Sequence, residues 1–273
     1  MKRRFELVAV NTLLLLAALL VLFPLGWMVS ASLMPAGETN VFPPRLLPSR
    51  VTFEHYATLF AQEGMGRFFA NSLLLATTTT VLSLLFNSAA GYAFAKLRFP
   101  GRARLFRALL GALLIPAQVA MLPLFLMLRE LGLVNTYAGV ILPAMAGVAG
   151  IFLIRQYALS IPDDLLEAAR IDGASELAIY FRIVLPLIRP ILVTLAIFTF
   201  LGTWHDFFWP LIVLTDGDRF TLPVALASLS REHVQDNELM MAGAVVTVAP
   251  VLLLFLALQR FYIQGILVGS VKG

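Results

Sequence analysis

Residues 161–190 read IPDDLLEAARIDGASELAIYFRIVLPLIRP, a polar interruption in a sequence that is otherwise rich in apolar residues. Ser160 is expected to cap a helix that carries Pro162 and two aspartates in its first turn, because proline there loses no hydrogen bond and carboxylates favour the positive end of a helix. Gly173 is expected to end that helix, since a residue without a Cβ adopts the left-handed conformation at low cost.

A second helix is expected to start at Ser175 and to run to Pro186. We call residues 160–186 the elbow. The pattern predicts a short polar helix that lies across the end of a helical bundle, followed by a helix that re-enters the bundle. Such a surface suits docking to a partner, and a plain amphipathic connector between two membrane helices is the alternative interpretation.

The composition is that of an integral membrane protein. Hydrophobic residues make up 60% of the 273 residues, charged residues 13%, and the mean hydropathy is +0.88. A soluble domain is about half apolar and about a quarter charged. The absence of cysteine excludes disulfides, thiolate metal sites and cysteine nucleophiles. The net charge is +4, and the basic residues lie beside apolar runs. This placement indicates a role in membrane orientation rather than in nucleic-acid binding.

Apolar runs long enough to cross a bilayer, which takes about 20 residues, predict an all-α membrane fold with six transmembrane helices. The first run is too long for a signal peptide and is interpreted as a retained span. One permease domain is expected over residues 1–273, with an external loop at 34–67 that contains a short helix near 53–60, and a second external loop at 215–238. The six predicted spans are approximately 7–30, 69–95, 105–127, 137–159, 187–214 and 239–258.

Basic residues predict the orientation of these spans. Fourteen lysines and arginines fall on the side that carries both termini and the elbow, and six fall on the other side. Positively charged loops are retained in the cytoplasm. The termini and the elbow are therefore expected to be cytoplasmic.

The elbow carries a spaced motif that resembles a known family. Glu167, Ala168 and Ala169 are followed after three residues by Gly173, and after nine more by residues 183–186, which read IVLP. This spacing is similar to the EAA signature of permease subunits in ATP-binding-cassette importers. The resemblance implies that the first helix of the elbow is a coupling helix, which sits in a cleft of a cytoplasmic ATPase and receives its ATP-driven movement.

Nearly the whole chain resembles the smaller membrane subunit of carbohydrate-uptake importers of the maltose-transporter type. His205 departs from that group, which usually has asparagine between the tryptophan and the aspartate. The similar segments are 71–72 (NS), 91–96 (GYAFAK), 99–102 (FPGR), 131–136 (LGLVNT), 154–156 (IRQ), 203–207 (TWHDF), 209–211 (WPL) and the tail 269–273.

The resemblance implies a set of partners and a location. The subunit would pair with a second, different permease, with two ATPase subunits that hold ATP and magnesium, and with an extracytoplasmic solute-binding protein. It would be a multi-pass protein of a bacterial or archaeal cytoplasmic (inner) membrane, with no cofactor of its own and no bound nucleic acid. The solute is expected to be a mono-, di- or oligosaccharide, and a glycerol-phosphate-type solute is the alternative.

Coupling roles follow from the resemblance. Glu167 would pair with a basic or hydroxyl group on the ATPase, the two alanines would allow close approach, and Gly173 would allow the turn. A solvated helix face is the alternative for Glu167. The tail resembles segments that contact the ATPase dimer. The predicted coupling residues are Glu167, Ala168, Ala169, Arg170, Asp172, Gly173, Ser270 and Lys272.

Polar and aromatic residues inside the spans are candidates for the translocation pathway. Polar groups at membrane depth are costly and usually face an interior cavity, and aromatic rings pack against the C–H faces of sugars. A packed, hydrogen-bonded contact between helices is the alternative for each. The candidates are Asn71, Asn87, Gln118, Trp204, His205, Asp206 and Trp209.

A membrane enzyme and a secondary transporter are the alternatives to an importer subunit. A membrane enzyme could use His205 and Asp206 as an acid–base pair, but neighbouring helical residues point about 100° apart, and no nucleophile or metal cluster accompanies them. A secondary transporter would need ionisable residues in several spans. No Walker motif is present, so ATP hydrolysis would come from a partner. Co-purification with ATPase subunits separates the importer from both alternatives.

Overall fold

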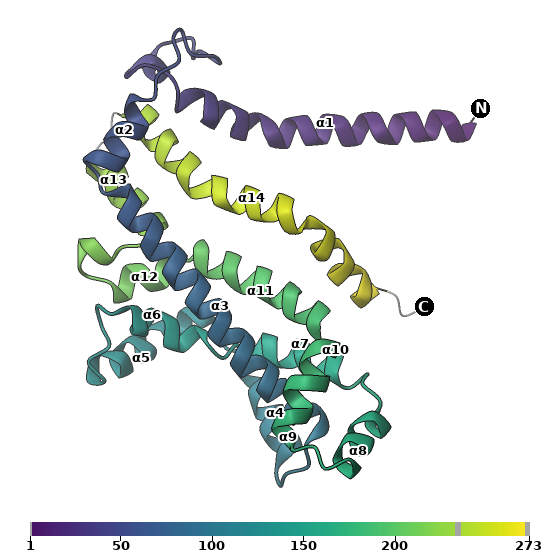
Figure 1. Cartoon of the computed structure of the whole chain (residues 1–273). Coiled ribbons are helices and arrows are strands. Elements are labelled where there is room, and N and C mark those ends of the chain that lie inside the picture. Colours follow the sequence, from purple (N-terminus) through teal and green to yellow (C-terminus); the bar gives the residue numbers. More distant parts are fainter. Residues whose placement is uncertain (1, 233–235, 271–273) are drawn as a thin grey trace. The chain divides into compact units, whose positions relative to one another are not determined.

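The structure is a computed structural model that describes residues 2–232 and 236–270 (Figure 1), and in that part of the chain every regular element is helical. The predicted all-α class is confirmed. The elements are α1 (Lys2–Ala31), η1 (Glu38–Asn40), α2 (Glu54–Ala61), α3 (Met65–Lys96), α4 (Arg102–Ala112), α5 (Ala117–Glu130), α6 (Tyr137–Ala144), α7 (Val148–Ala158), α8 (Asp163–Ile171), α9 (Glu176–Ile179), η2 (Tyr180–Val184), α10 (Leu185–Leu187), α11 (Arg189–Trp204), α12 (Phe208–Val213), η3 (Gly217–Arg219), α13 (Leu222–Glu232) and α14 (Asn237–Ser270).

The chain divides into two compact units. Unit 1 comprises Met1–Phe69 and Leu222–Leu252, and unit 2 comprises Ala70–Thr221 and Leu253–Gly273. Helices α3 and α14 each continue from one unit into the other. The expectation of one permease domain over the whole chain stays a prediction.

Several helices are long and apolar enough to cross a bilayer. Four segments of the described residues meet this condition alone: Glu6–Ala31, Met65–Lys96, Tyr137–Ala158 and Asn237–Ala257. Two further helix pairs meet it together but are bent, α4 with α5 by 104° and Glu176–Leu187 with α11 by 78°. These helices support the membrane class. The described part of the chain holds four candidate spans, or up to six if each bent pair is one span, so the number six stays a prediction.

The third predicted span, 105–127, is not one straight helix. Helix α4 ends at Ala112 and α5 begins at Ala117, with Pro116 at the N-cap position in an extended conformation (φ −58°, ψ 134°). Proline lacks a backbone N–H and disfavours helix in the residue before it, so the chain breaks there. Gln118 consequently lies in the first turn of α5 rather than in the middle of a span.

Two more expectations about continuity need correction. The fifth predicted span, 187–214, is broken after Trp204, and α12 begins only at Phe208. The segment 215–238 is not a plain loop, because it contains η3 and the eleven-residue helix α13. The short helix expected near 53–60 is confirmed as α2.

Two buried carboxylates fix the loop that follows α1 in unit 1. Glu38 is 8% exposed and accepts a hydrogen bond from Arg45 at 2.9 Å. Glu238, at the start of α14, is fully buried and accepts the backbone N–H of Thr39 at 2.7 Å. The loop is thereby held against α14 within unit 1.

Among its described residues, unit 2 contains three groups of packed apolar side chains. The largest joins α3 and α7 to the elbow and includes Tyr92, Ile154 and Leu166. A second surrounds Trp209 where α5, α6 and α12 lie together, and a third joins α3, α4 and α7 around Phe106. Figure 1 shows α4, α8 and α9 at one end of this unit and α5, α6 and α12 at the other. The elbow is therefore part of a packed end of the bundle.

Helices α3 and α7 approach closely because glycine lies at their contact. A Cβ on Gly91 would come within 2.6 Å of Ile154 Cγ2, and a Cβ on Gly150 within 2.5 Å of Asn87 Nδ2. Neither distance is tolerated between real atoms. Small residues at helix contacts allow this approach in membrane proteins. The close contact brings the ends of α3 and α7 together beside the elbow.

Candidate functional site

The first helix of the elbow is α8, and its start differs in one detail from the prediction. Pro162 occupies the N-cap position, whereas the hydroxyl of Ser160 donates to the Tyr157 carbonyl at 2.7 Å. The predicted Ser160 cap is wrong, because that hydroxyl closes the end of α7 instead. Asp163 and Asp164 lie in the first turn of α8 as expected, next to the positive end of the helix.

The turn after α8 forms where the sequence predicts it. Gly173 has φ +83°, a left-handed conformation, and its N–H donates to the Arg170 carbonyl at 3.0 Å. The Ser175 hydroxyl then accepts the N–H of Ala178 at 3.2 Å and caps α9. The chain continues through η2, a π-helical turn, into α10. The restart at Ser175 is confirmed.

Helix α8 has one buried side and one free side. Leu166 is 1% exposed and packs into the apolar group of α3 and α7, while Ala169 is half-buried against the same group. Glu167 and Ala168 are exposed. Asp172, after the last turn, is also exposed. The outward side is therefore open to a partner.

The side chain of Lys96, the last residue of α3, holds the start of α8. Its Nζ donates to the Ile161 carbonyl at 2.6 Å and to Asp163 Oδ1 at 2.7 Å, and the side chain is only 6% exposed. The hydrogen bond from Lys96 holds the pKa of the Asp163 carboxyl below its usual value. A second backbone carbonyl, that of Leu159, lies at 3.5 Å. The ammonium group thus joins the end of α7, the start of α8 and the end of α3.

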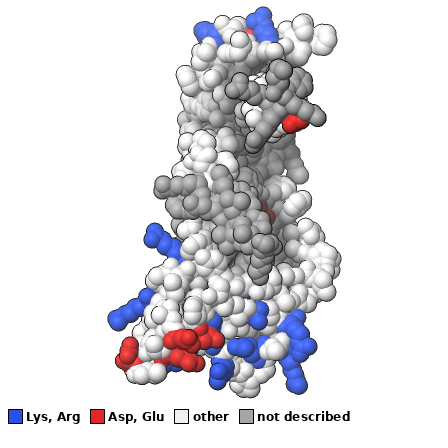
Figure 2. Space-filling model, turned by 90° about the vertical axis from the view of Figure 1, so that its right-hand side faces the viewer, with Lys and Arg blue, Asp and Glu red and all other residues white. Residues whose placement is uncertain are grey.

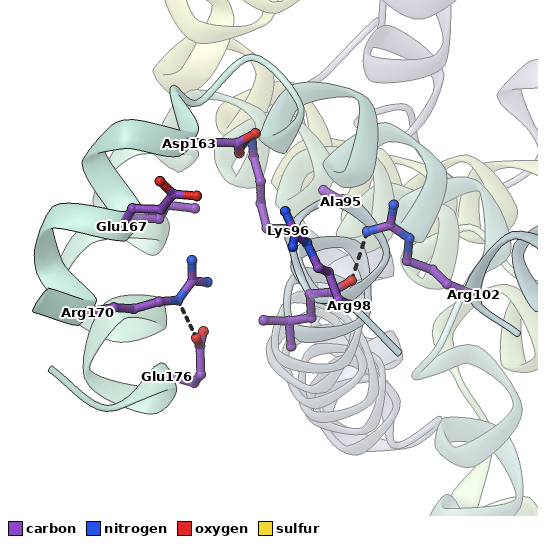
Figure 3. Close-up of a pocket in the computed structure, with 10 residues that line it drawn as sticks. Ala95, Lys96, Arg98, Arg102, Asp163, Glu167, Arg170 and Glu176 are labelled. Atoms are coloured by element: carbon purple, nitrogen blue, oxygen red, sulfur yellow. Dashed lines mark hydrogen bonds and ion pairs between the residues drawn. The ribbon is translucent and has the colours of Figure 1, made fainter. Parts of the chain in front are cut away.

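Glu176 forms a second attachment, at the start of α9. One carboxylate oxygen accepts from the Tyr92 hydroxyl of α3 at 2.9 Å, and the other accepts from Arg170 Nε of α8 at 2.7 Å. The bond from Arg170 lowers the pKa of the Glu176 carboxyl, and the same bond raises the pKa of the Arg170 guanidinium. Figure 3 shows Arg170 and Glu176 facing each other across the turn. Arg170 therefore braces the elbow internally.

A third attachment lies one turn before Tyr92 on α3, where the hydroxyls of Ser88 and Tyr180 are 2.6 Å apart. Ser88, Tyr92 and Lys96 are spaced by four residues and therefore share one face of the helix. We call these three residues the α3 stripe. In the sequence, Lys96 stands out as a basic residue and, with Tyr92, as part of the family-like segment 91–96, but no role in holding the elbow was predicted for any of the three. Their spacing of four residues was the available signal.

A hollow separates α8 from the region that links α3 and α4. Its volume is about 680 Å³, and charged side chains line both walls. Asp163, Glu167 and Arg170 lie on the α8 side, and Arg98 and Arg102 on the other. Figure 3 shows these side chains pointing into the space between the two walls. Figure 2 shows acidic and basic side chains gathered at this same end of unit 2. The hollow offers charges of both signs to a docking partner.

The residues predicted for a translocation pathway lie in several different environments. Asn71 donates to the Asp218 and Phe220 carbonyls at 3.0 Å each and accepts from the Tyr137 hydroxyl at 2.8 Å. This amide has a clear structural role, which favours the packed-contact alternative for it. Gln118 is exposed at the start of α5.

Asn87 is 1% exposed, and its amide nitrogen donates to the Ser83 hydroxyl at 2.7 Å. Its amide oxygen is buried without a hydrogen-bond partner in the described part of the chain. Buried polar atoms are rarely left unpaired, so this oxygen is the pathway candidate with spare bonding capacity.

The remaining four candidates lie close together in sequence, at the break between α11 and α12. Trp204 is 1% exposed and stacks on Phe200, while His205 is exposed. Asp206 Oδ1 accepts the N–H of Trp209 at 3.3 Å, and the Trp209 ring donates to the Gly139 carbonyl at 3.2 Å. Trp209 therefore has a structural partner, and the pathway role of this group stays a prediction.

The predicted contacts of the tail remain predictions. Ser270 is the last residue of α14, and Lys272 lies outside the described residues.

Residues 87–268, which include the elbow and the whole α3 stripe, match the family described as binding-protein-dependent transport system inner membrane component. The chain belongs to this family. The predicted resemblance to importer permeases is confirmed. The chain is a transport subunit of the inner membrane rather than an enzyme.

Named relatives of this permease family cover almost the whole chain. The arabinooligosaccharides transport system permease protein AraQ of Halalkalibacterium halodurans is 42% identical over 94% of this chain and 93% of its own length. The lactose transport system permease protein LacG of Rhizobium radiobacter is 35% identical over 100% of this chain and 98% of its own. A chain from the crystal structure of a bacterial ABC transporter for the acidic polysaccharide alginate has a TM-score of 0.86 and 25% identity, over 96% of this chain and 98% of its own.

The attachment by Lys96 can be tested by hydrogen exchange. Lys96→Met removes the donor and leaves the Ile161 carbonyl unpaired, which costs about 1–3 kcal/mol. Local opening of the elbow should therefore become at least about tenfold more frequent. The expected result is faster exchange of the amides of residues 172–174, measured by mass spectrometry on the purified complex.

Arg98→Met is the matched control, because Arg98 is an exposed residue two positions after Lys96 and lines the same hollow without holding α8. It should leave exchange in the elbow unchanged. Equal exchange in the two variants would contradict the role of Lys96.

Proposed function

We propose that this permease is one of two different membrane subunits of an ATP-driven importer, which moves a sugar delivered by an extracytoplasmic binding protein. The named relatives support the sugar, since the relatives described above carry arabinooligosaccharides and lactose in their names. The scarcity of basic residues within the spans also favours a neutral solute. Selection of one sugar would lie largely with the binding protein and the other permease.

The observation that carries the proposal is the free side of α8. Glu167 and Ala168 are exposed on a helix that is anchored by the buried Leu166, and no ion partner of Glu167 is found within residues 2–232 and 236–270. A carboxylate that is fixed on a braced helix and left unpaired is suited to a basic or hydroxyl group on another protein. We infer that this protein is one of two ATPase subunits, which bind ATP and magnesium.

The orientation belongs to the same proposal. The fourteen basic residues on the side of the termini and the elbow favour a cytoplasmic position for both. An ATPase that draws on cytoplasmic ATP would meet the elbow there. Six spans with both termini in the cytoplasm would place the elbow between the fourth and fifth spans.

The attachments suggest how movement passes into the membrane. When the ATPase subunits close on ATP, α8 would move with the cleft that holds it. Because Lys96 and Glu176 bind α8 and α9 to α3, the end of α3 would follow. The paired permeases could then change from an inward-facing to an outward-facing state, provided that nucleotide and solute each bind the two states with different affinity.

Reversal of the charge at Glu167 tests the docking. The importer, assembled from this permease, its partner permease, the ATPase subunits and the binding protein, is reconstituted in proteoliposomes and supplied with ATP and radiolabelled sugar. Glu167→Lys replaces an attractive contact with a repulsive one, and loss of a charged hydrogen bond alone costs about 1.5–3 kcal/mol, so uptake should fall at least about tenfold.

The matched control is Glu130→Lys, which reverses an exposed charge at the end of α5, outside the elbow. It should transport normally, and both variants should be found in the membrane at the wild-type amount. Normal uptake by Glu167→Lys would refute the docking proposal.

The turn at Gly173 gives a second test, because it separates backbone strain from crowding. No atom lies within 4 Å of a Cβ built there, so a side chain fits, but φ +83° is strained for most residues by about 1–2 kcal/mol. Gly173→Leu should therefore impair uptake, whereas Gly173→Asn should retain most of it, since asparagine tolerates the left-handed conformation. Equal uptake by the two variants, measured in the same proteoliposomes, would show that the conformation of the turn is unimportant.

A further inference from the structure

A second, smaller pocket in unit 2 is lined by arginines and phenylalanines that make no contact described above with the elbow. One of them, Arg102, also borders the hollow. Its volume is about 210 Å³, and its walls come from α3, α4 and α7. The lining residues are Phe94, Arg102, Ala103, Phe106, Arg107 and Arg155.

Each of the three arginines is held in place by one backbone carbonyl. Arg102 Nη1 donates to the Leu97 carbonyl at 2.8 Å, Arg155 Nε to the Phe94 carbonyl at 3.3 Å, and Arg107 Nε to the Ala103 carbonyl at 3.3 Å. The Arg155 guanidinium also lies 4.1 Å from the centre of the Phe106 ring. A guanidinium has five N–H donors, so each of the three keeps donors for a further acceptor.

The pocket lacks a negative charge to balance these groups. Within residues 2–232 and 236–270, no carboxylate lies at ion-pair distance from Arg102, Arg107 or Arg155. Like charges around one pocket repel each other, and the repulsion is stronger where protein replaces water. An anion would relieve that repulsion, and the planar fork of arginine matches the oxygens of a phosphate group.

The surroundings of the pocket are those of a membrane interface. Arg155 lies in the last turn of α7, directly after an apolar run, and the ring of Phe106 lies 5.4 Å from that of Phe94 and 6.5 Å from that of Phe152. Basic residues that directly follow an apolar transmembrane run are typical of the cytoplasmic end of a membrane span. Leu105 on α4 and Leu153 on α7 are 53% and 40% exposed, as expected for side chains that face acyl chains.

We propose that this pocket binds the phosphate of an anionic phospholipid, with Arg102, Arg107 and Arg155 around the headgroup. Basic pockets between transmembrane helices are known to take such headgroups. The lipid would balance the arginines and stabilise the packing of α4 on α7 at the end of α3. With the proposed orientation, the bound lipid would lie in the cytoplasmic leaflet. The site itself does not depend on that orientation.

The experiment titrates dioleoyl phosphatidylglycerol into the detergent-solubilised importer complex and counts bound lipids by native mass spectrometry. At about a fivefold loss per arginine, Arg102→Gln with Arg107→Gln should weaken the affinity of this site about 25-fold. Ala103→Phe should abolish binding there without any change of charge, because the added ring would fill the pocket. Arg104→Gln, an exposed arginine of the same helix that does not line the pocket, should bind the lipid like the wild type.

Two further arms identify the source of the phosphate. Dioleoyl phosphatidylcholine should not replace the bound phosphatidylglycerol, and inorganic phosphate should not displace it. Displacement by inorganic phosphate would overturn the lipid assignment in favour of a free anion. Loss of the partner permease from the pocket variants, at any lipid concentration, would instead show that a carboxylate of that subunit fills the site.

Unchanged phosphatidylglycerol binding by Ala103→Phe and by the double variant would also overturn the proposal. That result would leave the importer function intact, since sugar uptake by the wild-type complex is measured separately. Arg155 is kept in all variants because its contact with Phe106 supports the fold.

Discussion

The bond from the Lys96 ammonium to the Ile161 carbonyl is the constraint on which the position of the elbow depends. The neighbouring ion pair contributes less, because the Asp163 side chain is 74% exposed and water screens the attraction between exposed charges. A charged donor on a buried carbonyl contributes about 1.5–3 kcal/mol, and Lys96 itself is only 6% exposed. Its charge also lies at the C-terminus of α3, where a cation is favoured. The same residue thus ends one helix and positions the next.

The other contacts of the elbow turn this one bond into a rigid attachment. Tyr92 and Ser88 bind the elbow one and two turns before Lys96 on α3. Leu166 packs into the apolar group that joins α3 and α7 to the elbow. Glu176 joins α9 to both α8 and α3. These bonds leave Glu167 exposed at the wall of the hollow and Ala168 exposed beside it. A partner that moves this helix would therefore move α3 as well, which is what a coupling element requires.

The local geometry of the elbow could be predicted from sequence because it depends on a few neighbouring residues. Pro162, Gly173 and Ser175 each impose a conformation that does not require the rest of the fold. Gly173 and Ser175 lie where expected, whereas Pro162 occupies the N-cap position that was expected for Ser160. The apolar runs likewise predicted the membrane class, since bilayer thickness sets their length.

The missed features depend on contacts between distant segments. The partners of the α3 stripe lie up to 92 residues away, so no local pattern could identify them. The break at Pro116 was missed because proline inside a membrane helix is compatible with either a kink or an end, and only the packing decides which. Asn71 could be singled out as a buried polar group, but its partners at Tyr137 and in the segment 218–220 appear only in the folded chain.

The most direct test is a distance measurement between the elbow and α3 in the working importer. The chain has no cysteine, so spin labels can be placed on Ile171→Cys, which is 86% exposed at the end of α8, and on Arg98→Cys, just after α3. Double electron–electron resonance then compares the nucleotide-free complex with the complex that holds a non-hydrolysable ATP analogue. If the elbow and α3 move as one body, the distance distribution is narrow and the same in both states. A shift or a broadening of that distribution on nucleotide binding would contradict the attachment.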